Sequence, residues 1–141
     1  MTLLSKCAEF TSKFEGCRLE AYRDTVNVLT VGFGHTGSDV IPGMVITQEE
    51  ALNLLAQDLG AAYNGVKRLI KANLSDDQYM ALIDFTFNLG SGTLQRSTLR
   101  QRLNRGDIDC ANEFLKYNKA GGKPLRGLTI RRQAEAGLWT S

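Results

Sequence analysis

A short β-prone segment punctuated by glycines interrupts a chain whose apolar residues otherwise recur at helical spacing. Between Gly16 and Gly34 the helical spacing stops, and Asn27 stands at a position suited to a turn with positive φ. A small hairpin is therefore predicted here, and a hairpin set among helices predicts an α+β, mostly helical fold. The residues that favour strands are Tyr22, Val26, Val28, Thr30, Val31 and Phe33.

Two carboxyl groups flank this segment in different surroundings. An apolar pattern predicts an N-terminal helix over residues 1–14, with Gly16 as its stop, so Glu15 closes the helix. The partial negative charge at the carbonyl end of a helix favours a carboxyl that keeps its proton. The hairpin carries Asp24 on one arm and Thr30 on the other, and both come close to Glu15 if the hairpin folds back.

One protonated and one ionised carboxyl are what glycoside hydrolysis requires. Spacing alone is weak evidence, because a chain with 15 acidic residues contains many such pairs, most of them solvated surface groups.

Two capping-box patterns predict helix starts in the remainder of the chain. Thr47 with Glu50 opens a long helix at about 47–71, and Ser75 with Gln78 opens a second helix that Gly90 and Gly92 end. Further helices are expected at about 93–104, 107–117 and 128–138, the last bringing Trp139 into the core as a packing residue.

The segment around the two carboxyl groups resembles the signature of phage-type lysozymes, glycoside hydrolase family 24. The shared pattern is E-G-x-R-L-x-A-Y-x-D, five further residues, then T-x-G-x-G-H, from Glu15 to His35. Similarity continues through most of the chain, at residues 46–51, 81–90, 118–123, 127–128 and 131–139.

The resemblance implies one lysozyme domain over residues 1–141 with a cleft between two lobes. A small β-containing lobe is expected at about 15–46 and a connecting helix at about 47–71. The helical lobe then comprises about 72–141 together with the N-terminal helix 1–14.

The resemblance also implies catalytic roles. Glu15 is the implied general acid, Asp24 the carboxylate that activates or stabilises, and Thr30 the residue that holds the attacking water. The implied substrate is bacterial peptidoglycan, cut at the β-1,4 bond between N-acetylmuramic acid and N-acetylglucosamine, with no cofactor and no metal. We expect inversion, which needs about 6.5–9.5 Å between the carboxyl groups, whereas a nucleophilic Asp would lie roughly 5–5.5 Å away.

Further roles follow from the same resemblance. Phe87 and Asn88 are candidate substrate-binding residues, although Phe87 is equally compatible with the core. An arginine is expected near Glu15, with Arg126 and Arg131 as the candidates.

His35 is interpreted as a structural residue near the site, with Asp58 as its partner. Asn27 departs from the family, in which many members carry Gly. Because Asn tolerates left-handed backbone geometry, the hairpin should remain intact.

The implied biological role is that of an endolysin. Such a protein accumulates in the host bacterial cytoplasm, depends on a holin for access to the wall, and acts on periplasmic peptidoglycan after release. We expect a monomer that binds no nucleic acid and inserts no segment stably into the membrane. Two alternatives remain: a lytic transglycosylase acting on the same bond, and a non-catalytic wall-binding module.

Charge and cysteine content add two expectations. Residues 1–95 contain 7 basic and 11 acidic groups, whereas residues 96–141 contain 10 and 4. The basic C-terminal part either binds an anionic partner, such as cell wall, lipopolysaccharide or nucleic acid, or forms ordinary solvated helix faces. The odd number of cysteines, Cys7, Cys17 and Cys110, favours free thiols over a disulfide framework.

Overall fold

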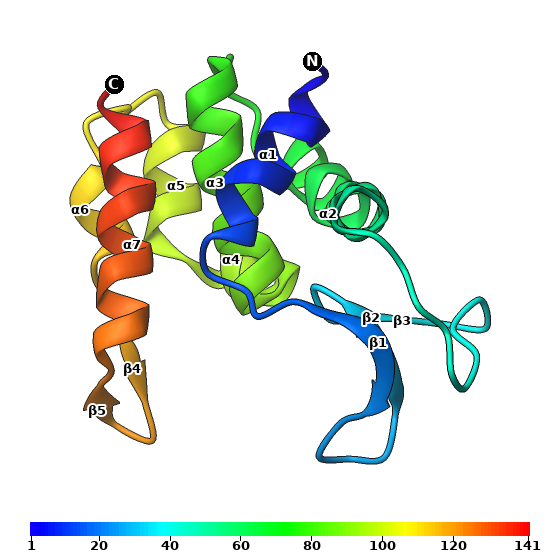
Figure 1. Cartoon of the computed structure of the whole chain (residues 1–141). Helices are drawn as coiled ribbons and strands as arrows, with labels where there is room; N and C mark the ends of the chain where they lie inside the picture. Colours follow the sequence, from blue (N-terminus) through cyan, green and yellow to red (C-terminus); the bar gives the residue numbers. More distant parts are fainter. The chain divides into compact units, whose positions relative to one another are not determined.

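The computed structural model describes residues 1–141, and helices form most of it (Figure 1). The predicted α+β, mostly helical class is confirmed. The chain divides into two compact units, which we call unit 1 (Met1–Gly60) and unit 2 (Ala61–Ser141). The lobe boundaries expected from the sequence stay a prediction.

Unit 1 contains a helix, a small antiparallel sheet and the first part of a long helix. Helix α1 is Leu3–Ser12, and the strands are β1 (Arg18–Arg23), β2 (Leu29–Gly32) and β3 (His35–Thr36), in the order β1-β2-β3. The predicted hairpin is formed by β1 and β2, with Tyr22 opposite Thr30. The short third strand was not predicted, because only two residues of it pair with β2.

Helix α1 ends earlier than the sequence predicted. Its last helical residue is Ser12, and the amides of Lys13 and Phe14 donate to the carbonyls three residues before them, Phe10 and Thr11. This tightening of the final turn is common at helix ends. Glu15 therefore lies in a bend just beyond the helix, and the prediction that it closes the helix is wrong.

The long helix α2 spans Gln48–Leu69, and it begins with the predicted capping box. Glu50 N donates to Thr47 Oγ1 at 3.1 Å, and Thr47 N donates to Glu50 Oε1 at 3.1 Å. These two bonds satisfy amides that have no partner within the helix.

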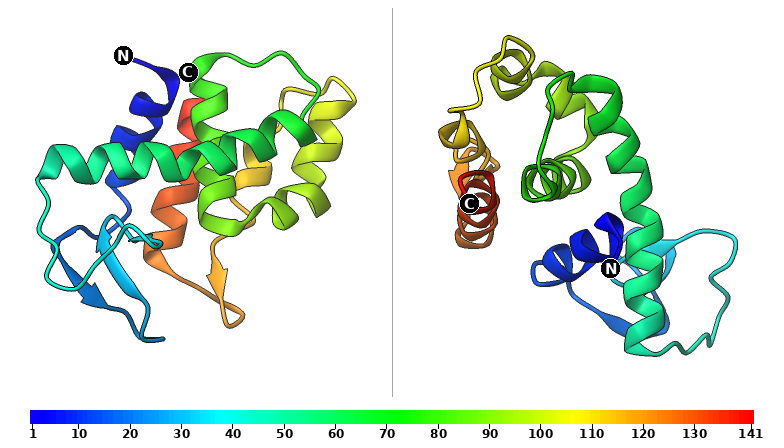
Figure 2. Two further views of the ribbon diagram at one scale, coloured as in Figure 1. Left: turned by 90° about the vertical axis from the view of Figure 1, so that its right-hand side faces the viewer. Right: turned by 90° about the horizontal axis from the view of Figure 1, so that it is seen from above.

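Unit 2 is helical apart from one small hairpin (Figure 2). After the end of α2, its elements are α3 (Asp76–Leu89), α4 (Ser91–Arg96), α5 (Thr98–Asn104), α6 (Ala111–Phe114), β4 (Lys119–Ala120), β5 (Lys123–Pro124) and α7 (Arg126–Trp139). Phe85 of α3 is completely buried and packs edge-on against Phe114 and Tyr117. Helix α3 has the predicted capping box at Ser75 and ends at Gly90, which has a φ of 94°.

The single helix predicted at about 93–104 is wrong, because the structure has two helices there. Ser97 has an extended backbone, with φ −80° and ψ 149°, and its hydroxyl accepts a hydrogen bond from Arg100 N at 3.0 Å. Ser97 thus ends α4 and caps α5. A serine at this position competes with helix continuation by offering its side chain to the backbone.

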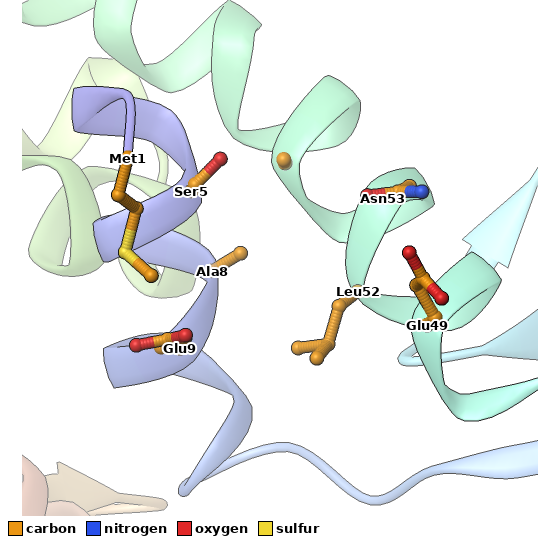
Figure 3. A pocket seen from close by; sticks show the side chains of 8 residues that line it. Met1, Ser5, Ala8, Glu9, Glu49, Leu52 and Asn53 are labelled. Atoms are coloured by element: carbon orange, nitrogen blue, oxygen red, sulfur yellow. The ribbon is translucent and has the colours of Figure 1, made fainter.

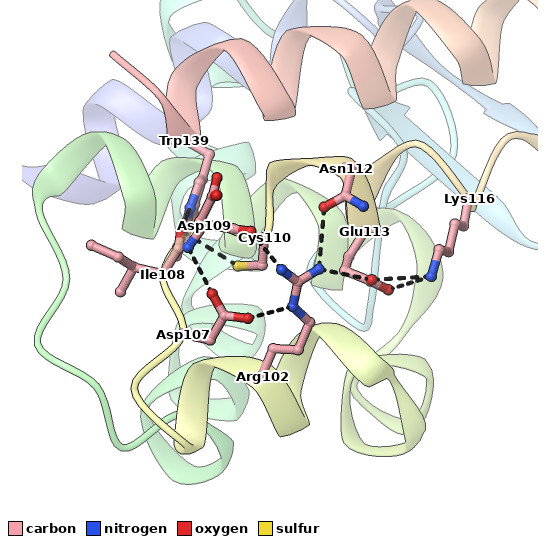
Figure 4. A network of polar contacts seen from close by, with 9 residues as sticks. All are labelled: Arg102, Asp107, Ile108, Asp109, Cys110, Asn112, Glu113, Lys116 and Trp139. Atoms are coloured by element: carbon pink, nitrogen blue, oxygen red, sulfur yellow. Dashed lines mark hydrogen bonds and ion pairs between the residues drawn. The ribbon is translucent and has the colours of Figure 1, made fainter.

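The helix predicted at about 107–117 is also wrong, since only Ala111–Phe114 is helical there. Arg102 holds the preceding loop in a non-helical path (Figure 4), because its guanidinium donates to Asp107 at 2.8 Å, to Glu113 at 3.1 Å and to the Asp109 carbonyl at 2.6 Å. Trp139, buried as expected, donates from Nε1 to the Ile108 carbonyl at 2.8 Å.

The last predicted helix, 128–138, is present as α7 and begins two residues earlier. The β4–β5 hairpin before it was not predicted. Its turn is formed by Gly121 and Gly122, whose φ values of 59° and 79° glycine adopts without steric cost.

Two arginines on α7 carry their charge into the interior of unit 2. Arg131 makes a two-pronged contact with Asp84, with both N–O distances at 2.9 Å. Arg132 Nη2 donates to Glu135 Oε2 at 2.8 Å, and its Nε is 2.8 Å from Oε1 without hydrogen-bond geometry. Burial, assisted by a hydrogen bond with Asp84, holds the pKa of Glu135 well above its usual range, although the Arg132 charge opposes this.

Candidate functional site

The turn between β1 and β2 fixes one of the two predicted catalytic carboxyl groups. Asp24 Oδ1 accepts hydrogen bonds from Val26 N at 2.9 Å and from Val28 N at 2.8 Å. The Asp24 backbone closes the same turn, since its N donates to the Val28 carbonyl at 3.0 Å. Asx turns of this kind hold a carboxylate in one orientation. The other oxygen, Oδ2, has no hydrogen bond within the protein and is available to water or substrate.

Asn27 provides the left-handed residue that this turn needs. Its φ is 64°, the one positive φ among the non-glycine residues, so the prediction that Asn replaces Gly without disrupting the hairpin is confirmed. Asn27 N donates to the Asp24 carbonyl at 2.9 Å. From β1, Arg23 Nη1 donates to the Asn27 carbonyl at 3.1 Å and ties the turn to the strand.

Thr30 lies in β2 and is buried, with 4% of its surface exposed. Its hydroxyl donates to the Val28 carbonyl at 2.9 Å. Because the proton is already used, the oxygen can only accept a hydrogen bond from a neighbouring water. Val28 therefore links the two predicted residues: its amide orients Asp24 and its carbonyl orients Thr30.

Glu15 is half-buried in the bend between α1 and β1. Directly before it, Phe14 packs edge-on against Phe10 with ring centroids 5.3 Å apart, which fixes the chain at this point. Glu15, Asp24 and Thr30 all belong to unit 1. Their roles in catalysis stay predictions.

His35 lies between two carboxylates of unit 1. Nδ1 is 2.9 and 3.0 Å from the oxygens of Asp58 on α2, the predicted contact. Nε2 is 2.9 and 3.1 Å from the oxygens of Asp39, in the loop after β3. Ionised carboxylates only accept hydrogen bonds, so both ring nitrogens must donate, and only the protonated imidazolium can do this.

The environment of His35 favours that charged form. Burial of the ring lowers its pKa, but the hydrogen bonds and negative charges of Asp58 and Asp39 outweigh burial and raise the pKa above its ordinary value. The same contact lowers the pKa of Asp39. The sequence did not identify Asp39, because an i,i+4 spacing indicates a side-chain contact only within a helix and His35 lies in a strand.

Phe87 and Asn88 lie near the end of α3 in unit 2, and both are half-buried. Asn88 Oδ1 is buried and has no hydrogen-bond partner within the protein. A buried amide oxygen without a partner is unusual and costly. Asn88 is therefore the better candidate of the two for contact with a ligand.

The three cysteines are free, as expected. Burial raises the pKa of Cys17, whose Sγ lies 3.8 Å from Gln48 Oε1, and raises the pKa of Cys110 to about 11. Cys7 is buried in α1. Since the thiolate is the reactive form, the raised values disfavour reaction at Cys17 and Cys110.

A cavity of about 300 Å³ in unit 1 lies away from the predicted catalytic residues (Figure 3). It opens between α1 and the first turns of α2, and Leu52 and Ala8 form its apolar side. None of Glu15, Asp24 and Thr30 lines it. The lining residues are Met1, Ser5, Ala8, Glu9, Glu49, Leu52, Asn53 and Ala56.

Neither a metal site nor a membrane span is evident in the structure. No three His, Cys, Asp or Glu side chains are arranged to hold a metal ion. None of the helices combines the length and the apolar character needed to cross a bilayer.

Comparison with known proteins identifies the family. The phage lysozyme family model matches residues 12–135, and the chain belongs to this family. It is similar to an endolysin of Bacillus phage B103, at 46% identity over 129 residues. That match covers 89% of this chain and 49% of the relative, and a match to the Bacillus phage PZA endolysin covers 51% of that protein. The chain thus spans about half the length of these two relatives.

Two other proteins match along nearly their whole length. An endolysin of Acyrthosiphon pisum secondary endosymbiont phage 1 is 40% identical over 146 residues, which cover 100% of this chain and 99% of the relative. A crystal structure of a point mutant of P22 lysozyme superposes with a TM-score of 0.88 at 35% identity, covering 96% of each chain.

Proposed function

We propose that this protein is an endolysin, a muramidase that hydrolyses the β-1,4 bond between N-acetylmuramic acid and N-acetylglucosamine in bacterial peptidoglycan. Membership of the phage lysozyme family and similarity to endolysins support this activity. The observation that carries the proposal is the turn in which the Val28 amide orients Asp24 and the Val28 carbonyl orients Thr30.

We propose that the two oriented oxygens hold one water molecule between them. Asp24 Oδ2 has no protein donor, and Thr30 Oγ1 has already donated its proton, so both accept hydrogen bonds. A water that donates to both keeps its lone pair free for attack on the anomeric carbon. Asp24 is then the general base and Thr30 the positioning group.

Glu15 is the proposed general acid, which donates its proton to the leaving glycosidic oxygen. In an inverting reaction the acid and the base act on opposite faces of the sugar, with the water between base and sugar. Inversion of a β-glycoside releases the α-anomer first. NMR of the products before mutarotation tests this step, and an initial β-anomer would instead indicate a retaining reaction with Asp24 as nucleophile.

Asn88 is a proposed substrate-binding residue, and Phe87 is a second candidate with less support. The unpartnered amide oxygen of Asn88 is suited to an N–H donor, and the acetamido groups of the substrate supply such donors. An Asn88→Ala change should raise KM more than it lowers kcat, because it removes binding rather than a reacting group.

The decisive experiment compares the parent with Glu15→Gln on purified Gram-negative peptidoglycan, with released muropeptides identified by mass spectrometry. Removal of a general acid should lower the rate by about 10²–10⁴. Glu9→Gln is the matched control, since it makes the same chemical change on an exposed residue of α1 and should leave the rate unchanged.

Each outcome discriminates between the candidate functions. Products with reducing N-acetylmuramic acid ends from the parent and the control, and almost none from Glu15→Gln, support a hydrolytic muramidase. Anhydro ends indicate a lytic transglycosylase. No products from the folded parent indicate a wall-binding module.

We further propose that the protein is a monomer, is made in the host bacterial cytoplasm, and acts on periplasmic peptidoglycan once a holin opens the inner membrane. Expression with and without a holin should show lysis only in its presence. Lysis without a holin would contradict this dependence. Light scattering after gel filtration tests the monomer.

A further inference from the structure

Basic side chains are concentrated, without acidic ones, in residues 114–134 of unit 2. This stretch contains six Lys or Arg residues and no Asp or Glu. Three of the six contact carboxyl groups from outside the stretch at 2.8–2.9 Å: Lys116 contacts Glu113, Arg131 contacts Asp84 and Arg132 contacts Glu135. The other three, Lys119, Lys123 and Arg126, are exposed and make no ion pair.

These three cations lie on the β4–β5 hairpin and at the start of α7. Lys119 is opposite Pro124 and Ala120 is opposite Lys123, so the two lysines lie on opposite faces of a hairpin one strand layer thick. Leu125 N donates to the Asn118 carbonyl at 2.9 Å, which closes the hairpin directly before Arg126. Figure 1 shows the hairpin projecting beyond the first turn of α7.

Two exposed apolar side chains accompany the cations. Leu125 and Ile130 are each 46% exposed. Arg126 and Ile130 are four residues apart on α7 and therefore share one helix face. We call these five residues, Lys119, Lys123, Leu125, Arg126 and Ile130, the basic hairpin patch.

We propose that the basic hairpin patch binds anionic phospholipid headgroups at a bilayer surface. Lysine and arginine side chains are attracted to the phosphate groups, and neighbouring apolar side chains gain by entering the boundary between headgroups and acyl chains. The exposed Leu125 and Ile130 favour a lipid surface over a hydrated polymer, which offers them no apolar environment. Binding of this kind is peripheral and needs no membrane-spanning helix.

The expected strength follows from the number of cations. Each Lys or Arg near an anionic leaflet strengthens binding by about fivefold at moderate salt, and the attraction falls off over about 10 Å at 0.1 M salt. The lysines on both hairpin faces can reach the headgroup layer together if the hairpin points toward the surface. The double change Lys119→Gln with Lys123→Gln should therefore weaken binding roughly 25-fold.

The test measures co-sedimentation of the full chain with phosphatidylcholine vesicles, with and without phosphatidylglycerol. The matched control is Arg96→Gln with Arg105→Gln, which removes two exposed cations of unit 2 outside the patch and changes net charge equally. The proposal expects binding only to the anionic vesicles, a loss of about 25-fold for the hairpin variant, and a loss of no more than about twofold for the control. Leu125→Ser should add a further loss that persists at high salt.

Three results would overturn the proposal: no binding to anionic vesicles, equal losses for the two double variants, or a hairpin variant that loses binding to purified peptidoglycan while vesicle binding is unchanged. The second result would mean that net charge alone attracts the protein. The third would assign the patch to the wall polymer. Hydrolysis of soluble peptidoglycan fragments, which should be unchanged in both double variants, separates this proposal from the proposed function.

Discussion

Units 1 and 2 orient their polar side chains in different ways. In unit 1 the carboxylate of Asp24 is held by amides two and four residues away, and Thr30 is held by a carbonyl two residues away. In unit 2 Arg131 is held by Asp84, 47 residues earlier, and Asn104 Nδ2 donates to the Leu69 carbonyl, 35 residues earlier. A local turn can be recognised in a sequence, whereas a long-range pair depends on the packing of separate helices.

The units also differ in charge. Unit 1 contains 4 basic and 8 acidic side chains, net −4, and unit 2 contains 13 and 7, net +6. Unit 2 buries part of its charge in pairs, and the surplus that remains is positive and exposed. A buried ion pair holds two helices of unit 2 together, whereas an unpaired surface charge is available to a partner.

The prediction with the largest expected effect concerns the long-range Arg131–Asp84 pair of unit 2. Asp84→Asn should destabilise the protein by about 3–5 kcal/mol, because it removes the negative charge from a buried ion pair with Arg131. Chemical denaturation of the parent and the variant measures the difference. Asp109→Asn, on an exposed carboxylate of the same unit, should change stability by less than about 0.5 kcal/mol. Similar losses for both variants would show that burial of the pair is irrelevant.

The second prediction concerns the pair that the charged His35 forms with Asp58 in unit 1. Asp58→Asn should cost about 2 kcal/mol at about pH 6, because a hydrogen bond to a charged group is lost. The pKa of His35 is raised, so the stabilisation is complete below the ring's unfolded pKa, about 6.5, and is lost as the pH rises through the higher folded pKa.

Thermal unfolding of Asp58→Asn and the parent, measured from acidic to alkaline pH, tests whether the stabilisation is lost as the pH rises. The difference should be largest on the acidic side of neutrality and should shrink toward alkaline pH. Asp39→Asn should have a smaller effect, because 58% of the Asp39 side chain is exposed. Peptidoglycan hydrolysis should be largely retained in Asp58→Asn. A difference that grows with pH would contradict the charged state assigned to His35.

The third prediction tests the local turn of unit 1. Asn27→Ala should cost about 1 kcal/mol, because alanine tolerates a φ of 64° less well than asparagine. Asn27→Gly is the matched control and should be close to neutral. Because the same turn orients Asp24, Asn27→Ala should also reduce kcat with KM nearly unchanged. Equal stability of the alanine and glycine variants would show that the left-handed residue does not constrain the turn.

The smallest expected effect concerns the capping box, a motif that occurs in both units. Thr47→Ala at the start of α2 and Ser75→Ala at the start of α3 should each cost about 0.5–1 kcal/mol, because each removes a capping hydrogen bond. The two losses, measured by chemical denaturation, should be similar, since a capping box is local and independent of the fold around it. A much larger loss at Ser75 would mean that the long-range packing of unit 2 depends on this helix end.

The sequence determined the features of this protein that depend on residues close together in the chain. Both capping boxes, the β1–β2 hairpin, the left-handed Asn27 and the end of α3 at Gly90 were predicted, because each follows from backbone geometry within a few residues. The resemblance to phage-type lysozymes rests on the signature from Glu15 to His35 and on similarity through most of the chain, and the match to the family model confirms it.

Only the tertiary structure decided where side chains distant in the sequence meet. The expected helix at 107–117 is replaced by a loop because Arg102 binds Asp107, the Asp109 carbonyl and Glu113. Likewise Arg131 is paired with Asp84, 47 residues earlier, and Asn104 Nδ2 donates to the Leu69 carbonyl, 35 residues earlier. Such contacts arise when packing brings polar and charged groups from separate elements together, and no local propensity encodes the choice of partner.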